Sequence, residues 1–181
     1  MASTWSNAEL RLMTTGENDN TWGDQTNDNI KRLDDMVNQF IGVTLTGATE
    51  TLTFTNDPTS YARENGRCKI LNFSGTPGAT CTVTFPNKLM WYYVLNNTGD
   101  SNDIICKAGT GAATYTVSAG RDAIIYVDGS DEIYNTLNDL QVSTINGVTA
   151  DNIATKGFAT AMAIALSVSY THLTLPTIYS V

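Results

Sequence analysis

The chain has 181 residues, enough for one domain of ordinary size and some additional structure. Charged residues make up 15% of it, below the roughly 25% of typical soluble domains, and the net charge is −8. An acidic chain with ten scattered basic residues offers no surface for a phosphate backbone, which argues against a nucleic-acid binder. No apolar run reaches about 18 residues, and the N-terminus lacks a secretory pattern, so we expect neither membrane insertion nor secretion.

Residues 1–25 are polar and rich in turn-forming residues. Trp5 and Trp22 are the large apolar side chains in this stretch, which cannot bury much surface of its own. We therefore expect an extended segment that is either mobile or docked on another surface.

The stretch 26–42 predicts an amphipathic helix. The Thr-Asn pair at 26–27 can cap its start, and Gly42 is expected to end it. Its apolar side chains follow helical spacing and form one stripe: Ile30, Leu33, Val37, Phe40 and Ile41. We expect this stripe to pack against the next domain or against sister helices. Asp34 and Asp35 are expected on the solvated face.

Between residues 43 and 137 the pattern changes to a period of two, with short β-prone runs every 8–12 residues. Eight or nine strands of this kind favour an antiparallel β-sandwich or jelly-roll-like module. Asn65-Gly66 and Asp128-Gly129 are typical of tight hairpin turns. The 28 threonines of the chain suit this interpretation, because threonine is β-branched and gives strands a polar, uncharged outer face.

Residues 138–166 carry thinly spread apolar side chains, with the start of a helix over 156–166. Such a pattern is too sparse to close a core within one chain and is often completed by symmetric copies. We expect a thin shaft or linker here.

The last stretch, about 167–181, resembles a sequencing adapter translated in one frame, most closely over Val168–Thr177. We therefore leave it out of the fold prediction, although its alternation alone would suggest a strand. The reading frame is then expected to continue beyond Leu166 in the source, which makes the chain an N-terminal fragment from a sequence assembly. The single histidine, His172, lies in this stretch, so we expect no imidazole chemistry in the native part.

No catalytic, cofactor-binding or metal-binding constellation stands out, and we expect a protein that is not an enzyme. The three cysteines are predicted to be buried thiols, with one bridge between strands as the alternative: Cys68, Cys81 and Cys106. The acidic residues near the second turn are predicted to serve turn geometry rather than calcium binding or acid-pair hydrolysis: Asp122, Asp128, Asp131 and Glu132.

The aromatic run Trp91-Tyr92-Tyr93 could suggest a sugar-stacking platform. On a strand, however, Tyr92 points away from its two neighbours, so only one side can stack, and the inward side is expected in the core. Tyr115, Tyr126 and Tyr134 are expected to be core or hydrogen-bonded edge residues.

Three stretches carry a resemblance to the tail-fibre and fibre-like virion structural proteins of tailed phages, especially marine ones. The first is MTTGENDNTWGDQTNDNIKRLDDMV within 10–40, a TGEN and TWG entry that runs into the predicted helix. The second is the strand-rich run from Cys68 to the YVDG turn. The third is the ATK junction in INGVTADNIATKGFA at 145–159. The resemblance covers about 9–160, and the order of the three motifs makes it more specific than each motif alone.

The resemblance implies a homotrimer in the virion, assembled in the host cytoplasm. It implies that the N-terminal part attaches to other virion proteins and that a distal part, which we do not find here, contacts the host surface. By position, the attachment residues would be Thr15, Gly16, Glu17, Asn18, Thr21, Trp22 and Gly23. The main alternative is a carbohydrate-binding β-sandwich module of a larger adhesin or tailspike, which would use Trp91 and the tyrosines.

Overall fold

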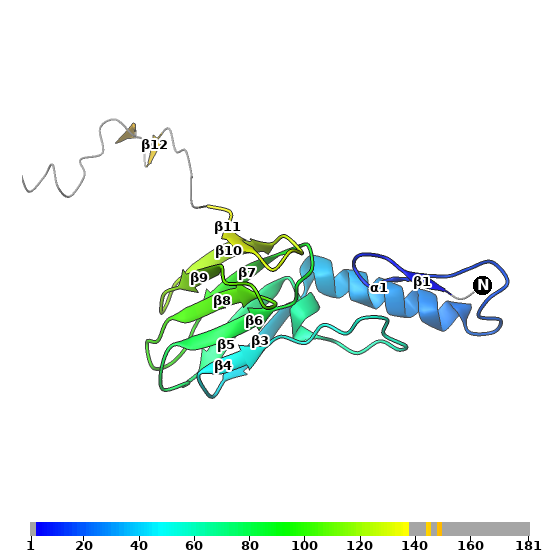
Figure 1. Cartoon of the computed structure of the whole chain (residues 1–181), viewed down its shortest axis with the longest axis horizontal. Helices are drawn as coiled ribbons and strands as arrows, with labels where there is room; N and C mark the ends of the chain where they lie inside the picture. Colours follow the sequence, from blue (N-terminus) through cyan, green and yellow to red (C-terminus); the bar gives the residue numbers. More distant parts are fainter. Residues whose placement is uncertain (1–2, 138–143, 146–147, 150–181) are drawn as a thin grey trace, which may run out of the picture. The chain divides into compact units, whose positions relative to one another are not determined.

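The computed structural model describes residues 3–137, 144–145 and 148–149, which fall in two compact units, Met1–Asn138 and Asp139–Val181 (Figure 1). In the second unit, β12 (Thr144–Ile145) pairs antiparallel with β13 (Val148–Thr149). Apart from this short pair, the predicted shaft at 138–166 and the adapter-like stretch at 167–181 lie outside the described residues.

The first unit begins with a small two-stranded ribbon beside a helix. Strands β1 (Thr4–Trp5) and β2 (Arg11–Leu12) pair antiparallel, and α1 (Trp22–Asn38) follows (Figure 1). The amide side chain of Asn29 on α1 joins the two, because it accepts a hydrogen bond from Arg11 N at 2.9 Å and donates one to Arg11 O at 2.8 Å. The N-terminal segment is thus docked on the helix.

The helix begins and ends four residues earlier than the predicted 26–42. Thr21 occupies the N-cap position without a side-chain capping bond, and the helix ends at Asn38. Gly42 therefore does not end the helix but lies within strand β3 (Phe40–Leu45). The physical reason is that Phe40–Leu45 pairs over its whole length with Ile70–Gly75, and this long-range pairing prevails over local helical periodicity.

Nine strands follow the helix and form two sheets. The described residues are therefore mostly β-strand, with one helix longer than a single turn. This mostly-β character with one N-terminal helix was predicted. The five-stranded sheet has the order β11-β10-β7-β5-β3, with β5 at Ile70–Gly75, β7 at Met90–Asn96, β10 at Asp122–Val127 and β11 at Ile133–Asn135. The four-stranded sheet has the order β4-β6-β8-β9, with β4 at Thr49–Thr51, β6 at Cys81–Phe85, β8 at Ile104–Ala108 and β9 at Thr114–Val117. A short 3-10 helix, η1, spans Asn65–Arg67.

The prediction of antiparallel sheets is wrong, because both sheets are mixed. Strands β3, β5 and β7 pair parallel, as do β4, β6 and β8, while β10, β11 and β9 add antiparallel. From β3 to β8 the chain alternates between the sheets, so the turns at 76–78 and 97–99 lead from one sheet to the other. Asp128-Gly129 does form a hairpin turn, between β10 and β11, whereas Asn65-Gly66 lies in η1.

The alternation winds the chain into two successive coils, and the second has the same length in both sheets. Ile70 pairs with Tyr93 in one sheet and Cys81 with Ile104 in the other, and both pairs are 23 positions apart (93 − 70 and 104 − 81). The first coil is longer, since Phe40 pairs with Ile70, 30 positions away (70 − 40). That longer coil contains the loop 52–67, which meets the N-terminal segment.

The core lies between the two sheets and consists of the side chains that alternate inward along each strand. Phe85 and Tyr92 form its centre, with their rings edge to face at a centroid separation of 5.0 Å. Cys68, Cys81 and Cys106 are buried free thiols, which confirms the first of the two predictions for them. The outward side chains differ between the two sheets.

Candidate functional site

The predicted attachment residues form a turn and the start of the helix. Gly16 and Asn18 have φ of 83° and 65°, the left-handed conformation that glycine and asparagine tolerate best. The Glu17 carboxylate accepts hydrogen bonds from Ser3 N at 2.9 Å and from Ser3 Oγ at 2.7 Å. These bonds from Ser3 hold the pKa of Glu17 below its usual value. The turn therefore ties the chain's first residues to the start of α1.

Thr21, Trp22 and Gly23 form the N-cap position and the first two residues of α1. Thr21 N donates to Asn18 O at 2.9 Å, and Asn18 Oδ1 accepts from Gln25 Nε2 at 2.8 Å. Hydrogen bonds within this short segment therefore stabilise the first turn of α1. Trp22 projects with 64% of its surface exposed, while Thr15 is also exposed. The structure thus brings all seven predicted residues together, with Trp22 as their large apolar contact.

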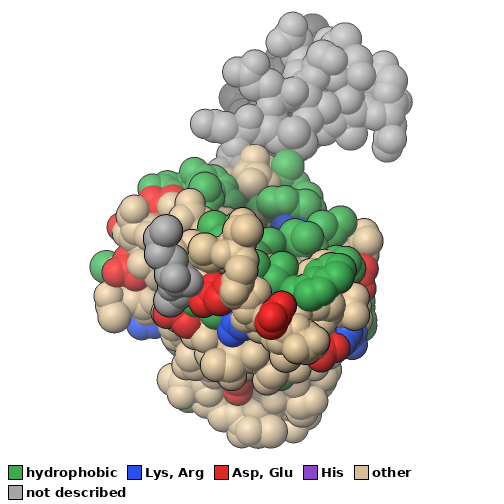
Figure 2. Space-filling view, turned by 90° about the vertical axis from the view of Figure 1, so that its right-hand side faces the viewer, with side chains coloured by type: hydrophobic (Ala, Val, Ile, Leu, Met, Phe, Trp, Pro, Cys, Tyr) green, Lys and Arg blue, Asp and Glu red, His purple; other side chains and the backbone are tan. Residues whose placement is uncertain are grey.

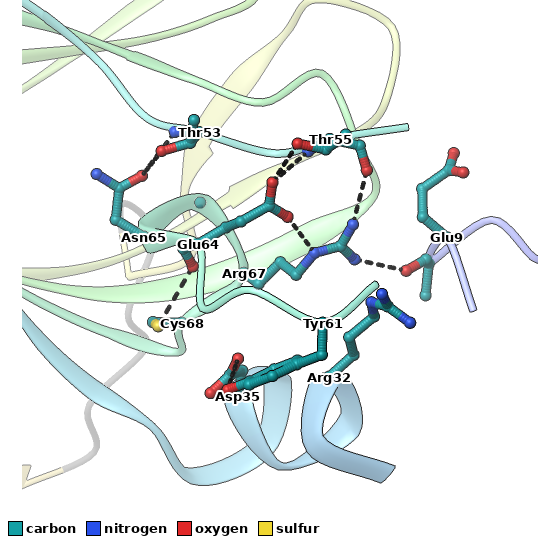
Figure 3. Close-up of polar contacts among 12 residues, drawn as sticks. Glu9, Arg32, Asp35, Thr53, Thr55, Tyr61, Glu64, Asn65, Arg67 and Cys68 are labelled. Atoms are coloured by element: carbon teal, nitrogen blue, oxygen red, sulfur yellow. Dashed lines mark hydrogen bonds and ion pairs between the residues drawn. The ribbon is translucent and has the colours of Figure 1, made fainter. Parts of the chain in front are cut away.

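A buried arginine in η1 joins the N-terminal segment to the β-sandwich (Figure 3). Arg67 is fully buried, and each nitrogen of its guanidinium donates one hydrogen bond. Nε donates to Glu64 Oε2 at 2.6 Å. Nη1 donates to Ala8 O at 2.9 Å, and Nη2 donates to Thr55 O at 2.8 Å. Its guanidinium also lies 3.9 Å from the centre of the Phe54 ring. Each nitrogen is thus paired, as a buried arginine requires.

Glu64 completes this cluster by accepting hydrogen bonds from Thr55 N at 2.8 Å and from the Thr55 hydroxyl. Burial alone would raise the pKa of Glu64, but the hydrogen bonds from Thr55 and Arg67 outweigh burial and lower it. Glu64 is therefore held as a carboxylate at neutral pH.

A second ion pair joins the N-terminal segment to the loop before β7. Lys88 Nζ lies 2.7 Å from Glu9 Oε1, and Asp57 N donates to Glu9 Oε2 at 3.1 Å. Burial raises the pKa of Glu9, but the bonds from Lys88 and Asp57 N outweigh it, so the pKa is lowered. Sequence reasoning missed Arg67, Glu64 and Glu9, because charged residues in a turn-rich loop give no sign of burial.

Helix α1 meets the rest of the unit through its charged side. Arg32 and Asp35 are the buried helical residues, and Arg32 Nη2 donates to Ser60 O at 2.7 Å. Asp35 accepts from Tyr61 Oη at 3.0 Å and pairs with Arg63 Nε at 3.1 Å. The prediction that Asp35 lies on the solvated face is therefore wrong, because partners in the loop 60–63 take it out of water; Asp34 is exposed as predicted.

The apolar stripe of the helix points the other way. Ile30, Leu33 and Val37 are 57%, 45% and 61% exposed, and Phe40, just after the helix, is 51% exposed. The expectation that the stripe packs against the next domain does not hold within the described residues, although Ile41 packs against the core from β3. Packing against sister helices stays a prediction.

The aromatic residues of β7 alternate as predicted: Tyr92 is buried, whereas Trp91 is 49% exposed. Trp91 pairs with Tyr126 and Tyr126 with Tyr134 across the five-stranded sheet, and the two tyrosine rings stack at 4.9 Å. Tyr134 is 43% exposed, so it is not a core residue; Tyr115 packs against the core and its hydroxyl accepts from Asn135 Nδ2 at 2.6 Å. An outward row of aromatic side chains results.

The acidic residues near the second turn have structural partners. Asp128 Oδ1 accepts the N–H groups of Ser130 at 2.7 Å and Glu132 at 3.2 Å, and Asp131 Oδ2 accepts from Thr110 Oγ1 at 2.9 Å. Asp122 accepts from the Tyr93 hydroxyl. Over the part of the chain that the structure describes, no group of three histidine, cysteine or acidic side chains is arranged to hold a metal ion.

Comparison of the chain with protein-family models, curated proteins and solved structures finds no significant match. Among the described residues, no helix has the length and apolar character needed to cross a membrane.

Proposed function

We propose that this chain is a structural component of a phage virion, the virion-proximal part of a tail fibre or of a head-fibre-like protein, without enzymatic activity. The observation that supports it most is the ordered set of motifs, in which the TGEN turn and the TWG residues at the start of α1 come before a strand-rich module. Residues 15–23 form one local structure, as an attachment motif requires.

The N-terminal turn attaches to other virion proteins in this proposal, with Trp22 as the main apolar contact. The hydrogen bonds of Arg67 to Ala8 and of Lys88 to Glu9 fix the loop between β1 and β2, which precedes that turn, to the rest of the unit. A shaft over 138–166 carries the distal host-recognition part away from the virion. Three copies hold three distal parts at a fixed reach, so multivalent contact with the host raises the effective affinity.

The exposed stripe on α1 supports self-association, because a large apolar surface on a single chain is normally covered by a partner. Light scattering on the full chain tests the homotrimer, and we expect three times the mass of one chain. A single-chain mass at micromolar concentration would contradict it.

Sequencing the locus on both sides of the reading frame tests the virion assignment separately. We expect neighbouring genes for portal, tail-tube or capsid proteins, and a continued reading frame past codon 166. A neighbourhood of secretion or polysaccharide-metabolism genes would contradict the assignment.

The aromatic row of Trp91, Tyr126 and Tyr134 favours one alternative, a carbohydrate-binding β-sandwich module of a larger adhesin or tailspike. Sugars stack on such rings through their apolar faces. A glycan array distinguishes the two functions: binding that Trp91→Ala abolishes would favour the module, and absence of binding would leave the fibre proposal.

A further inference from the structure

The two sheets present outer faces of opposite character. On the four-stranded sheet, threonines occupy most outward positions: Thr49, Thr51, Thr82, Thr84, Thr114 and Thr116. On the five-stranded sheet, apolar or aromatic side chains occupy most outward positions of β5, β7, β10 and the edge strand β11, among them Ile70, Trp91, Tyr93, Ile124, Tyr126 and Tyr134; the polar outward positions of these strands are Asn72, Ser74 and Asp122. Only the first face has the composition of an ordinary solvated sheet.

The apolar face of the sheet continues onto the helix stripe. Phe40 follows α1 directly and pairs with Ile70, Ile70 pairs with Tyr93, and Tyr93 pairs with Ile124. Figure 2 shows exposed hydrophobic side chains gathered on one side of the molecule. We call Ile70, Trp91, Tyr93, Ile124, Tyr126 and Tyr134, together with Ile30, Leu33, Val37 and Phe40, the apolar face.

A hollow of about 250 Å³ lies where the helix and the sheet meet. Met36 of α1 lines it from one side, and Leu89 and Trp91 from the other. Lys69 Nζ lies 4.0 Å from the centre of the Trp91 ring and donates to Trp91 O at 2.8 Å, so this cation is bound within its own chain. The hollow is of a size to take an apolar side chain of a partner.

We infer that the apolar face is the surface through which copies of this chain associate, an inference that rests on the proposed fibre function. Two observations favour a second copy as the occupant. Ile30, Leu33 and Val37 are spaced by three and four residues, the seam spacing with which helices pack on helices like themselves. The second observation is electrostatic.

Each copy carries a net charge of −8, so two copies repel each other over most of their surface. None of the ten side chains of the apolar face is charged. Asp122 is the acidic outward residue of the same strands, and its carboxylate accepts a hydrogen bond from the Tyr93 hydroxyl. Like-charged copies can therefore approach on this face at the lowest electrostatic cost while covering apolar surface.

Charge substitutions on exposed positions test the inference by light scattering on the full chain. Leu33→Glu on the helix and Trp91→Glu on the sheet alter side chains that are 45% and 49% exposed, so both variants should fold. Thr114→Glu, on the exposed face of the opposite sheet, is the matched control. We expect the assembled mass for wild type and control, and the mass of one chain for each of the other two variants.

A labelling experiment gives an independent measurement in case either charge variant misfolds. The three native thiols are buried, so a cysteine introduced by Val37→Cys or Thr114→Cys is the reactive one. We expect the thiol at position 37 to be labelled more slowly as protein concentration rises, and the thiol at position 114 to be labelled at an unchanged rate.

The outcomes separate this inference from the function on which it rests. An assembled mass that survives both charge variants, or equal labelling of the two introduced thiols, would overturn the apolar face as the interface while leaving a fibre multimer in place. A single-chain mass for the wild type would overturn both.

Discussion

The guanidinium of Arg67 donates a hydrogen bond to the carbonyl oxygen of Ala8 at 2.9 Å, although 59 positions separate the two residues. This bond connects the N-terminal segment to the interior of the β-sandwich. Arg67 is fully buried and also bonded to Glu64 and Thr55, so its guanidinium holds the N-terminal segment to the loop 52–67.

Arg67→Met should lower the free energy of unfolding by about 3–5 kcal/mol, since it leaves the Glu64 carboxylate buried without its counter-charge. Urea denaturation of the full chain measures this. Arg121→Met is the control, because Arg121 is exposed and its side chain makes no hydrogen bond or ion pair with the described residues, so its cost should stay within about 0.5 kcal/mol. Equal costs for the two variants would contradict the role given to Arg67.

Adjacent aspartates on α1 should behave differently. Asp35→Ala removes a buried carboxylate from Tyr61 and Arg63 and should cost about 3–5 kcal/mol of unfolding free energy. Asp34→Ala changes an exposed residue and should cost no more than about 0.5 kcal/mol. Urea denaturation measures the free energy of unfolding of both variants. A larger cost for Asp34→Ala than for Asp35→Ala would mean that Asp34, and not Asp35, is the buried aspartate of the helix.

Stability should depend on pH through Glu64 and Glu9, whose pKa values are lowered in the folded chain. Their stabilisation is complete above the unfolded pKa of about 4.3 and is lost as pH falls through the lower folded pKa. The free energy of unfolding should therefore decrease below about pH 5.

Urea denaturation at several pH values measures this dependence. Glu64→Gln should be less stable at neutral pH and should show a shallower decrease toward acid, because one of the two carboxylates no longer takes up a proton. An unchanged slope in this variant would show that other groups cause the acid sensitivity.

Substitution by alanine should destabilise the fold at one glycine and have little effect at another. Gly75 has φ of 95°, and a Cβ there would run into the carbonyl oxygen of Leu45, so Gly75→Ala should cost about 1–3 kcal/mol. Gly42 has no atom within 4 Å of its Cβ position and no positive φ, so Gly42→Ala should change stability by no more than about 0.5 kcal/mol. Thermal unfolding measures both; a large loss at Gly42 would favour the helix-ending role that its sequence position first indicated.

The three thiols should not react with a thiol reagent in the folded chain. Burial raises the pKa of Cys68 to about 11 and also raises those of Cys81 and Cys106, which keeps all three protonated at neutral pH. We expect all three to react after denaturation in urea. Rapid labelling of one thiol in the native chain would place it at the surface instead.

Local patterns in the sequence predicted the elements well but not their partners. The period of two located the strand-rich region between residues 43 and 137, because inward and outward residues alternate along its strands. The same pattern cannot tell whether the next strand returns to the same sheet, so the parallel pairing of β3, β5 and β7 was missed.

The orientation of the helix was missed for a related reason. The spacing of Ile30, Leu33 and Val37 correctly indicated an apolar stripe, and burial of that stripe is the usual outcome. Only the loop 60–63 reveals that Asp35 has buried partners, and no local pattern connects the two segments. The residues at 15–23 were found because the motif is local, whereas Arg67 depends on contacts from distant segments.

Because the chain winds between the two sheets, the number of strands in both sheets can change together, one coil at a time. Each 23-residue coil adds one strand to each sheet, and neighbouring strands lie about 4.8 Å apart. Insertion or deletion of one whole coil would preserve parallel pairing and inward-outward alternation in those that remain. The distance from α1 to β11 can therefore change between related chains by whole strand spacings without a redesign of the core.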